Sequence, residues 1–194
     1  MAETTTVVNA ERYAAGLSYA EFLEQANVNL DKFEEYYGTA NISEADANAL
    51  RSLSAKAGGP KKMLAIGEDW CPDVYRGLPL IAKIAETMGA ELRVFPRDKN
   101  LDIMNEFLNK GEFMSIPVAV FYTGGLEHIA SWFERPKFAD EERAKITADV
   151  KKEMPDADDQ GVRTAVRERT LPRYPSWQQA SVKEMIALLE KAVG

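Results

Sequence analysis

The strongest constraint on the fold of this chain is the alternation of short apolar runs with amphipathic segments between residues 61 and 133. Residues 63–66 and 118–122 are apolar runs of strand length, the second rich in β-branched and aromatic residues, and residues 92–95 form another short predicted strand. Between residues 66 and 92, apolar side chains recur three or four residues apart, the spacing of one helical face: Val74, Leu78, Ile81, Ala85 and Met88. Strands separated by helices favour parallel pairing. We therefore expect an α/β fold, a small mixed sheet with helices on both faces.

Helical segments precede and interrupt this alternation. Residues 1–60 form a predicted N-terminal helical extension, in which Ser43 and Asp46 mark the cap of a helix from 44 to about 57. In the same stretch apolar residues recur at helical spacing from Tyr19 to Leu30. Residues 61–194 form the predicted main domain, with its core in 61–133 and a final amphipathic helix over about 178–193. Between these two parts lies a charged helical insertion, 134–176, with a surface helix over 141–152.

Two further elements complete the predicted core. Asn100 or Asp98 is placed to cap a helix that carries Leu101, Met104, Phe107 and Leu108. The two glycines at 124–125 predict a tight turn into a final strand over 126–133, and so a hairpin with an antiparallel edge. Trp132 and Phe133 are bulky for a strand end, and they either pack beneath the insertion or make a contact between subunits.

Composition excludes several function classes. A net charge of -7 argues against nucleic acid or an anionic membrane as the main partner. The chain has no apolar run long enough to span a membrane and no secretory signal at its start. With one cysteine and one histidine, an intrachain disulfide and a multi-cysteine or multi-histidine metal site are excluded. We expect no metal and no cofactor, and a cytoplasmic location.

The single cysteine is placed where a thiol can be reactive. Cys71 follows the first predicted strand and Pro72 occupies the first position of the helix, where its missing N–H costs nothing. Unpaired backbone N–H groups and the positive end of the helix dipole stabilise a thiolate at that point. The carboxylates of Glu68, Asp69 and Asp73 act in the opposite direction, partly offset by the guanidinium of Arg76. The sequence leaves the direction of the net pKa shift open.

Four motifs in register carry a resemblance to the thioredoxin family. Trp70 directly before Cys71 resembles the family's Trp-Cys active site, and Pro79 lies where thioredoxins have the proline that kinks the active-site helix. Residues 98–100 resemble the family's Asp-x-Asn, and Ser115-Ile116-Pro117 resembles its Ile-Pro with a cis peptide bond facing the cysteine. The resemblance covers 61–133 and the last helix. The wider sequence looks like a bacterial branch of uncharacterised thioredoxin-like proteins, many with helices before the core.

Two departures from the family pattern bear on mechanism. The family's second active-site cysteine falls at Val74, so nothing in this chain can resolve a mixed disulfide on Cys71 from within. The family's buried acid, six residues before the first cysteine, falls at Ala65. The resemblance therefore implies a thioredoxin-like protein without the dithiol mechanism.

These observations lead to two functional hypotheses. The first is monothiol thiol-disulfide exchange, in which Cys71 attacks a disulfide-containing protein or a mixed disulfide, and a low-molecular-weight thiol completes the cycle. The second is a non-catalytic binding module, or a redox-sensitive partner-binding protein, that holds its partner in an expected groove beside Pro117. A second copy of the chain is a further candidate partner. The predicted substrate-binding residues are Trp70, Pro72, Asp73, Arg76, Ile116 and Pro117.

Overall fold

The computed structural model describes residues 6–194, in which four strands form one mixed sheet of order β2-β1-β3-β4. β1 (Lys62–Gly67) and β2 (Glu91–Pro96) run parallel, whereas β3 (Val118–Tyr122) is antiparallel to β1 and to β4 (His128–Phe133). The expected parallel pairing is thus right for the first two strands and wrong for the third. Pro96 at the end of β2 and Val118 at the start of β3 both lie beside the end of β1. The chain between them therefore starts and finishes at the same end of the sheet, and β3 runs in the direction opposite to β1 and β2. The antiparallel edge hairpin is confirmed.

The crossover from β1 to β2 is made by α5 (Pro72–Met88). The residues at helical spacing that the sequence singled out are all buried. Cys71 is the N-cap and Pro72 stands in the first turn, as predicted, while Pro79 lies inside the helix. Gly89 ends the helix with a positive φ of 65°, a backbone conformation that glycine adopts without a steric penalty.

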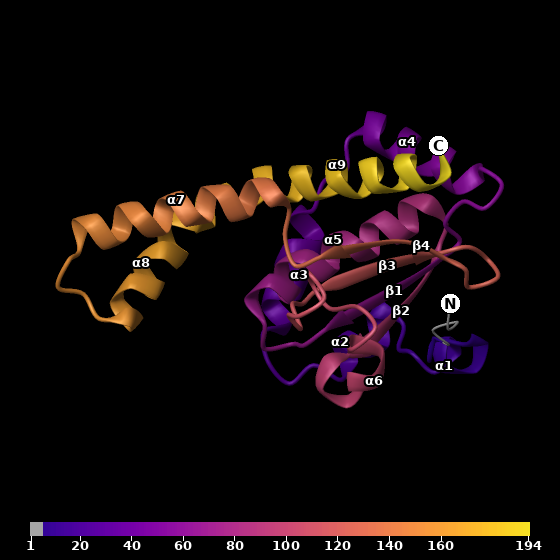
Figure 1. Cartoon of the computed structure of the whole chain (residues 1–194), viewed down its shortest axis with the longest axis horizontal. Coiled ribbons are helices and arrows are strands. Elements are labelled where there is room, and N and C mark those ends of the chain that lie inside the picture. Colours follow the sequence, from indigo (N-terminus) through magenta and orange to yellow (C-terminus); the bar gives the residue numbers. More distant parts are fainter. Residues whose placement is uncertain (1–5) are drawn as a thin grey trace.

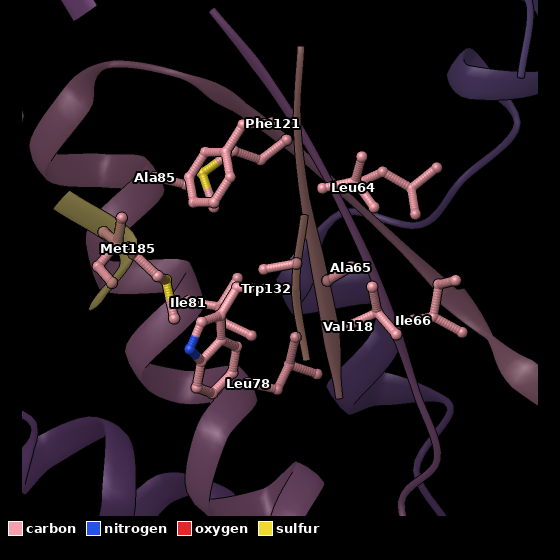
Figure 2. Packing of buried hydrophobic residues seen from close by; sticks show 14 of the residues in the cluster. Leu64, Ala65, Ile66, Leu78, Ile81, Ala85, Val118, Phe121, Trp132 and Met185 are labelled. Atoms are coloured by element: carbon pink, nitrogen blue, oxygen red, sulfur yellow. The ribbon is translucent and has the colours of Figure 1, made fainter. Parts of the chain in front are cut away.

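The core lies on both faces of the sheet, since β1 and β3 are buried along almost their whole length. Figure 2 shows Phe121 and Trp132 on the side of α5, near Ile81 and Ala85, whereas Leu64 points to the opposite side. α9 (Tyr174–Val193) packs against α5 and β4 and adds Met185 to this core. In Figure 1, α4, α5 and α9 lie above the strands, and α1, α2 and α6 lie below them. Helices on both faces were predicted, and the architecture is confirmed.

The N-terminal segment folds as four helices joined to the same core. They are α1 (Ala10–Ala14), α2 (Tyr19–Glu24), α3 (Leu30–Thr39) and α4 (Glu44–Ala55). The helical spacing from Tyr19 to Leu30 does not give one continuous helix: α2 ends at Glu24, and Asn29, with a φ of 60°, turns the chain just before α3 begins. The Ser43 cap is confirmed, since its side chain accepts a hydrogen bond from the backbone N–H of Asp46. Residues 1–5 of the predicted extension lie outside the described residues.

The predicted helix after β2 is much shorter than the apolar spacing suggested. It consists of a 3-10 turn (Arg97–Lys99) and α6 (Leu101–Met104), so Phe107 and Leu108 lie beyond it. The side chain of Asn100 does not cap α6. It donates to the carbonyl of Pro96 at 2.6 Å and accepts from Arg12 at 2.7 Å, which ties this turn to α1.

The insertion is helical, as predicted, but this helical arm contains two helices, and the first is longer than the predicted surface helix over 141–152. α7 (Lys137–Glu153) and α8 (Asp159–Thr170) pack on each other and project from the body of the molecule (Figure 1). A 3-10 turn (Leu171–Arg173) then leads into α9, which begins four residues earlier than predicted. Trp132 packs against α9, and its indole N–H donates to Glu184 at 3.1 Å. None of the helices within residues 6–194 has the length and apolar character needed to cross a membrane.

Candidate functional site

Three of the predicted site residues meet at the start of α5. The half-buried thiol of Cys71 lies there, with Sγ 4.0 Å from the carbonyl oxygen of Ile116. The peptide bond between Ile116 and Pro117 is cis. Ile116 precedes β3 and lies outside its pairing with β1, so its backbone is not used by the sheet. The fold thus places a thiol beside a backbone segment that the sheet leaves unpaired, although the two are 45 residues apart in sequence.

A glycine on α5 permits this approach. A Cβ atom at Gly77 would lie 2.9 Å from Cγ of Pro117, closer than ordinary van der Waals contact. Gly67, at the end of β1, has the same relation to Val74, where a Cβ atom would lie 2.7 Å from a side-chain methyl carbon. Both glycines therefore set how closely the start of α5, with Cys71 at its N-cap, packs on the end of β1 and on Pro117.

The loop before Cys71 is held from two sides. The backbone N–H of Asn27 donates to the carboxylate of Asp69 at 2.6 Å, and the side chain of Asn29 donates to the Asp69 carbonyl at 2.9 Å. On the other side, the N–H of Asp98 donates to the carboxylate of Glu68 at 2.7 Å. The connection between α2 and α3 is therefore part of the support of the site.

The carboxylate of Asp73 forms an ion pair with an arginine that follows β4. Arg135 pairs with Asp73 at 2.6 Å and with Asp140 at 3.1 Å, and it also contacts Glu134. Burial by itself would lower the pKa of Arg135, but the surrounding carboxylates raise it above its ordinary value. It is thus Arg135, and not Arg76 as the sequence suggested, that offsets the nearest carboxylate to Cys71.

The pKa of the Cys71 thiol is raised above its ordinary value, which settles the direction that the sequence left open. Burial is the main cause, and the carboxylates of Asp73 and Glu134 act in the same direction. Backbone N–H groups of Val74 and Asp73 favour the thiolate and lower the pKa, but they do not outweigh burial. At neutral pH Cys71 is therefore mainly the protonated thiol.

The other predicted site residues have different surroundings. Trp70 is 49% exposed and lies under the guanidinium of Arg97, whose central carbon is 5.1 Å from the ring centroid. Pro72 is exposed. Arg76 is only 8% exposed, and its guanidinium carbon lies 3.9 Å from the ring centroid of Tyr174.

Buried apolar residues occupy the two positions where the family has its second cysteine and its buried acid. Val74 and Ala65 are completely buried, in α5 and β1 respectively. Within residues 6–194 no group of three or more histidine, cysteine, aspartate or glutamate side chains is arranged to hold a metal ion. The described residues at this site can supply a nucleophilic sulfur, an adjacent peptide backbone and a paired carboxylate.

Sequence reasoning missed Arg135, Asn27 and Asn29 as parts of this site. Each acts through a tertiary contact with a residue at least 40 positions away, so neither spacing nor periodicity marks it. The apolar spacing from Tyr19 to Leu30 is unbroken, so it gave no sign of the turn at Asn29.

Comparison with known proteins is consistent with this geometry. A family model described as thioredoxin matches residues 16–150, about two thirds of the chain. Among solved structures, a protein of unknown function from Pseudomonas aeruginosa has 14% sequence identity and a TM-score of 0.67, covering 95% of this chain and 99% of that one. An HIV epitope-scaffold has 15% identity and a TM-score of 0.66, covering 97% and 99% respectively. No curated protein matches this sequence.

Proposed function

Because the chain belongs to the thioredoxin family, we propose that it carries out monothiol thiol-disulfide exchange at Cys71. The observation that carries this proposal is the position of the only thiol of the chain, at the N-terminus of α5 and 4.0 Å from the carbonyl of Ile116. A disulfide in an extended segment that docks along the backbone at Ile116 would bring one of its sulfur atoms to Cys71.

The exchange balances without any other cysteine of the chain. The Cys71 thiolate attacks one sulfur atom of a disulfide, forms a mixed disulfide, and expels the other sulfur as a thiolate that takes up a proton. A low-molecular-weight thiol, as its thiolate, then attacks the substrate sulfur of the mixed disulfide and releases Cys71. The substrate leaves as a disulfide with the small thiol, and the protein returns to its starting state.

Exposed apolar side chains next to both site segments support a protein as the disulfide partner. Trp70 precedes Cys71, while Phe113, 52% exposed, and Met114 precede Ile116 by two or three residues. Large apolar side chains in these positions suit the docking of an extended peptide with alternating apolar residues. A cytoplasmic location stays a prediction from the cysteine content.

The raised pKa of Cys71 favours a second candidate, a binding module in which the thiol does not turn over. A thiol that is mainly protonated attacks slowly at neutral pH, and its high pKa makes it a poor leaving group once an adduct has formed. In that case the same surface would hold a peptide, and oxidation or adduct formation at Cys71 would regulate binding.

Mass spectrometry of the reduced protein exposed to glutathione disulfide tests the proposal. We expect a single glutathione adduct that excess glutathione removes, and catalytic reduction of a glutathione mixed disulfide in the same buffer. Cys71→Ser should form no adduct and show no turnover. A reversible adduct without turnover would favour the binding module, and the absence of any adduct at pH 8.5, well into the range where ordinary thiols ionise, would refute exchange.

A further inference from the structure

A cavity of about 390 Å³ lies between the start of α5 and the helical arm, on the side of α5 that carries Arg76. Its wall includes Pro72 and Asp73 from α5, side chains from α7 and α8, and Tyr174 and Trp177 from α9. This volume lies in the range typical of small-molecule sites in proteins. It is formed by the arm together with the core. It shares Pro72, Asp73 and Arg135 with the site at Cys71, but neither Cys71 nor Ile116 lines it.

The charge of this cavity is opposite to that of the whole protein. The chain has a net charge of -7, yet the cavity is lined by five arginines and a single carboxylate, that of Asp73. The arginines are Arg76, Arg135, Arg143, Arg163 and Arg167. Asp73 is already bound to Arg135, so its charge is not available to the other four.

Those four guanidinium groups have no carboxylate within 4.0 Å among residues 6–194. The ion pairs of the arm involve other residues, for example Arg169 with Glu153 at 2.6 Å. The side chain of Arg163 donates a hydrogen bond to the neutral side chain of Gln160 at 3.4 Å. Like charges that converge on one concave surface repel one another, and an anion between them removes that repulsion.

Arg76 is the strongest indication of a ligand. Its side chain is more than nine-tenths buried, it lines the cavity, and its Nε–H has no hydrogen-bond partner in the described structure. The guanidinium lies against the ring of Tyr174, and burial of such a group without a polar partner is costly. Arg135, on the same wall, also has an Nε–H without a partner.

We propose that this cavity binds a small organic polyanion, with at least two phosphate or carboxylate groups attached to an apolar or planar portion. The guanidinium groups match the oxygen atoms of such groups, which accept several hydrogen bonds at once. Tyr174, Trp177, Val162 and Val166 supply the apolar part of the wall. The inference does not depend on exchange at Cys71.

Calorimetric titration of the full chain with pyrophosphate, adenosine diphosphate and citrate tests this assignment. We expect saturable binding of at least one of these probes at millimolar concentration or below, weakened by added sodium chloride. Binding of pyrophosphate but not of citrate would identify phosphate as the recognised group. Binding of citrate but not of pyrophosphate would identify carboxylate. Tighter binding of adenosine diphosphate than of pyrophosphate would show that the apolar wall contributes. No binding of any of the three would overturn the proposal.

Matched substitutions on the arm locate the binding. Arg143→Gln/Arg167→Gln removes two exposed charges of the cavity wall and should weaken binding at least about tenfold. Lys145→Gln/Arg173→Gln removes the same charge from exposed positions that do not line the cavity, and it should leave the affinity within about twofold. Equal weakening by both pairs would mean a diffuse charge effect and would refute the site. Cys71→Ser should bind the probes as the original chain does, which separates this outcome from any result on exchange.

Discussion

At the scale of single residues, the chemistry of Cys71 depends on a competition between the backbone and the surroundings of its side chain. The N-cap position supplies N–H groups that favour the thiolate, while burial and the nearby carboxylates favour the protonated thiol. Burial is the largest of these effects and raises the pKa. A helix N-terminus is therefore not sufficient to activate a cysteine when the sulfur is packed against the protein.

The first prediction concerns the pH dependence of this thiol. Because the pKa of Cys71 is raised, its thiolate fraction rises at higher pH than that of free cysteine, and its alkylation by iodoacetamide should show a midpoint above that of glutathione. Asp73→Asn removes one of the charges that disfavour the thiolate and should move the midpoint down. Asp31→Asn, an exposed change on α3, should leave it unchanged. A midpoint below that of glutathione would contradict the assignment.

The second prediction restores the missing thiol. Val74 lies one helical turn after Cys71 and is buried against Gly67. Val74→Cys should form an internal disulfide with Cys71 on mild oxidation and allow the protein to reduce insulin in the presence of dithiothreitol. Thiol titration before and after oxidation measures the bond, and Val74→Ala serves as the control for altered packing. Two free thiols after oxidation would mean that the start of α5 differs from the geometry described above.

At the scale of elements, the site depends on how closely α5 approaches the segment before β3. Gly77 faces Pro117 across this contact, and the absence of a side chain lets the two backbones come together. The same packing fixes the position of the Ile116 carbonyl relative to Cys71. The relation of these two elements, rather than either one alone, places the backbone of Ile116 beside the thiol of Cys71.

The third prediction is that Gly77→Ala destabilises the protein by about 1–3 kcal/mol, because the new methyl group would overlap Pro117. Adduct formation at Cys71 should also change, since Pro117 must move. Gly38→Ala is the matched control: it lies in α3 with nothing within 4 Å of the added atom, and it should stabilise the protein by about 0.5–1 kcal/mol. Urea unfolding of both variants measures the difference, and equal effects would show that the contact with Pro117 is not restrictive.

At the scale of the whole molecule, the N-terminal helices and the core form one apolar interior. Val8, Tyr13, Phe22 and Phe33 belong to the same buried cluster as the sheet. The hydroxyl of Tyr13 donates to the carbonyl of Glu91 at 2.7 Å, which ties α1 to β2. We therefore propose that residues 6–60 fold together with the core as one cooperative unit, although the sequence suggested a boundary at 61.

The fourth prediction tests this cooperativity. Phe33→Ala removes a completely buried ring from α3 and should cost about 3–5 kcal/mol. Tryptophan fluorescence and far-ultraviolet circular dichroism should shift together in urea, because loss of α3 weakens the whole fold. Leu30→Ala, at a position 42% exposed on the same helix, should cost much less. A separate transition at lower urea concentration, seen in the circular dichroism signal but not in the fluorescence, would indicate that the extension unfolds independently.

Local patterns in the sequence were sufficient to predict the α/β class of the fold and the position of the thiol at the start of a helix. The apolar face of α5, its N-cap at Cys71 and its C-terminal Gly89 are all set by residues within one helix, so spacing alone identifies them. The buried runs of β1 and β3 are equally local. Local patterns also have limits: apolar spacing predicted a helix through Leu108, but α6 ends at Met104, and the chain beyond it turns so that Asn109 pairs with Phe113.

The tertiary structure alone decided the direction of β3, the ion pair of Asp73 with Arg135, the raised pKa of Cys71 and the arginine-lined cavity. Each depends on groups far apart in the chain. Burial and electrostatic interaction act through distances in space, and those distances are set only when the arm and the N-terminal helices pack on the core. The sequence by itself determined which residue carries the thiol, while the assembled fold determined its protonation and the charge of the cavity beside it.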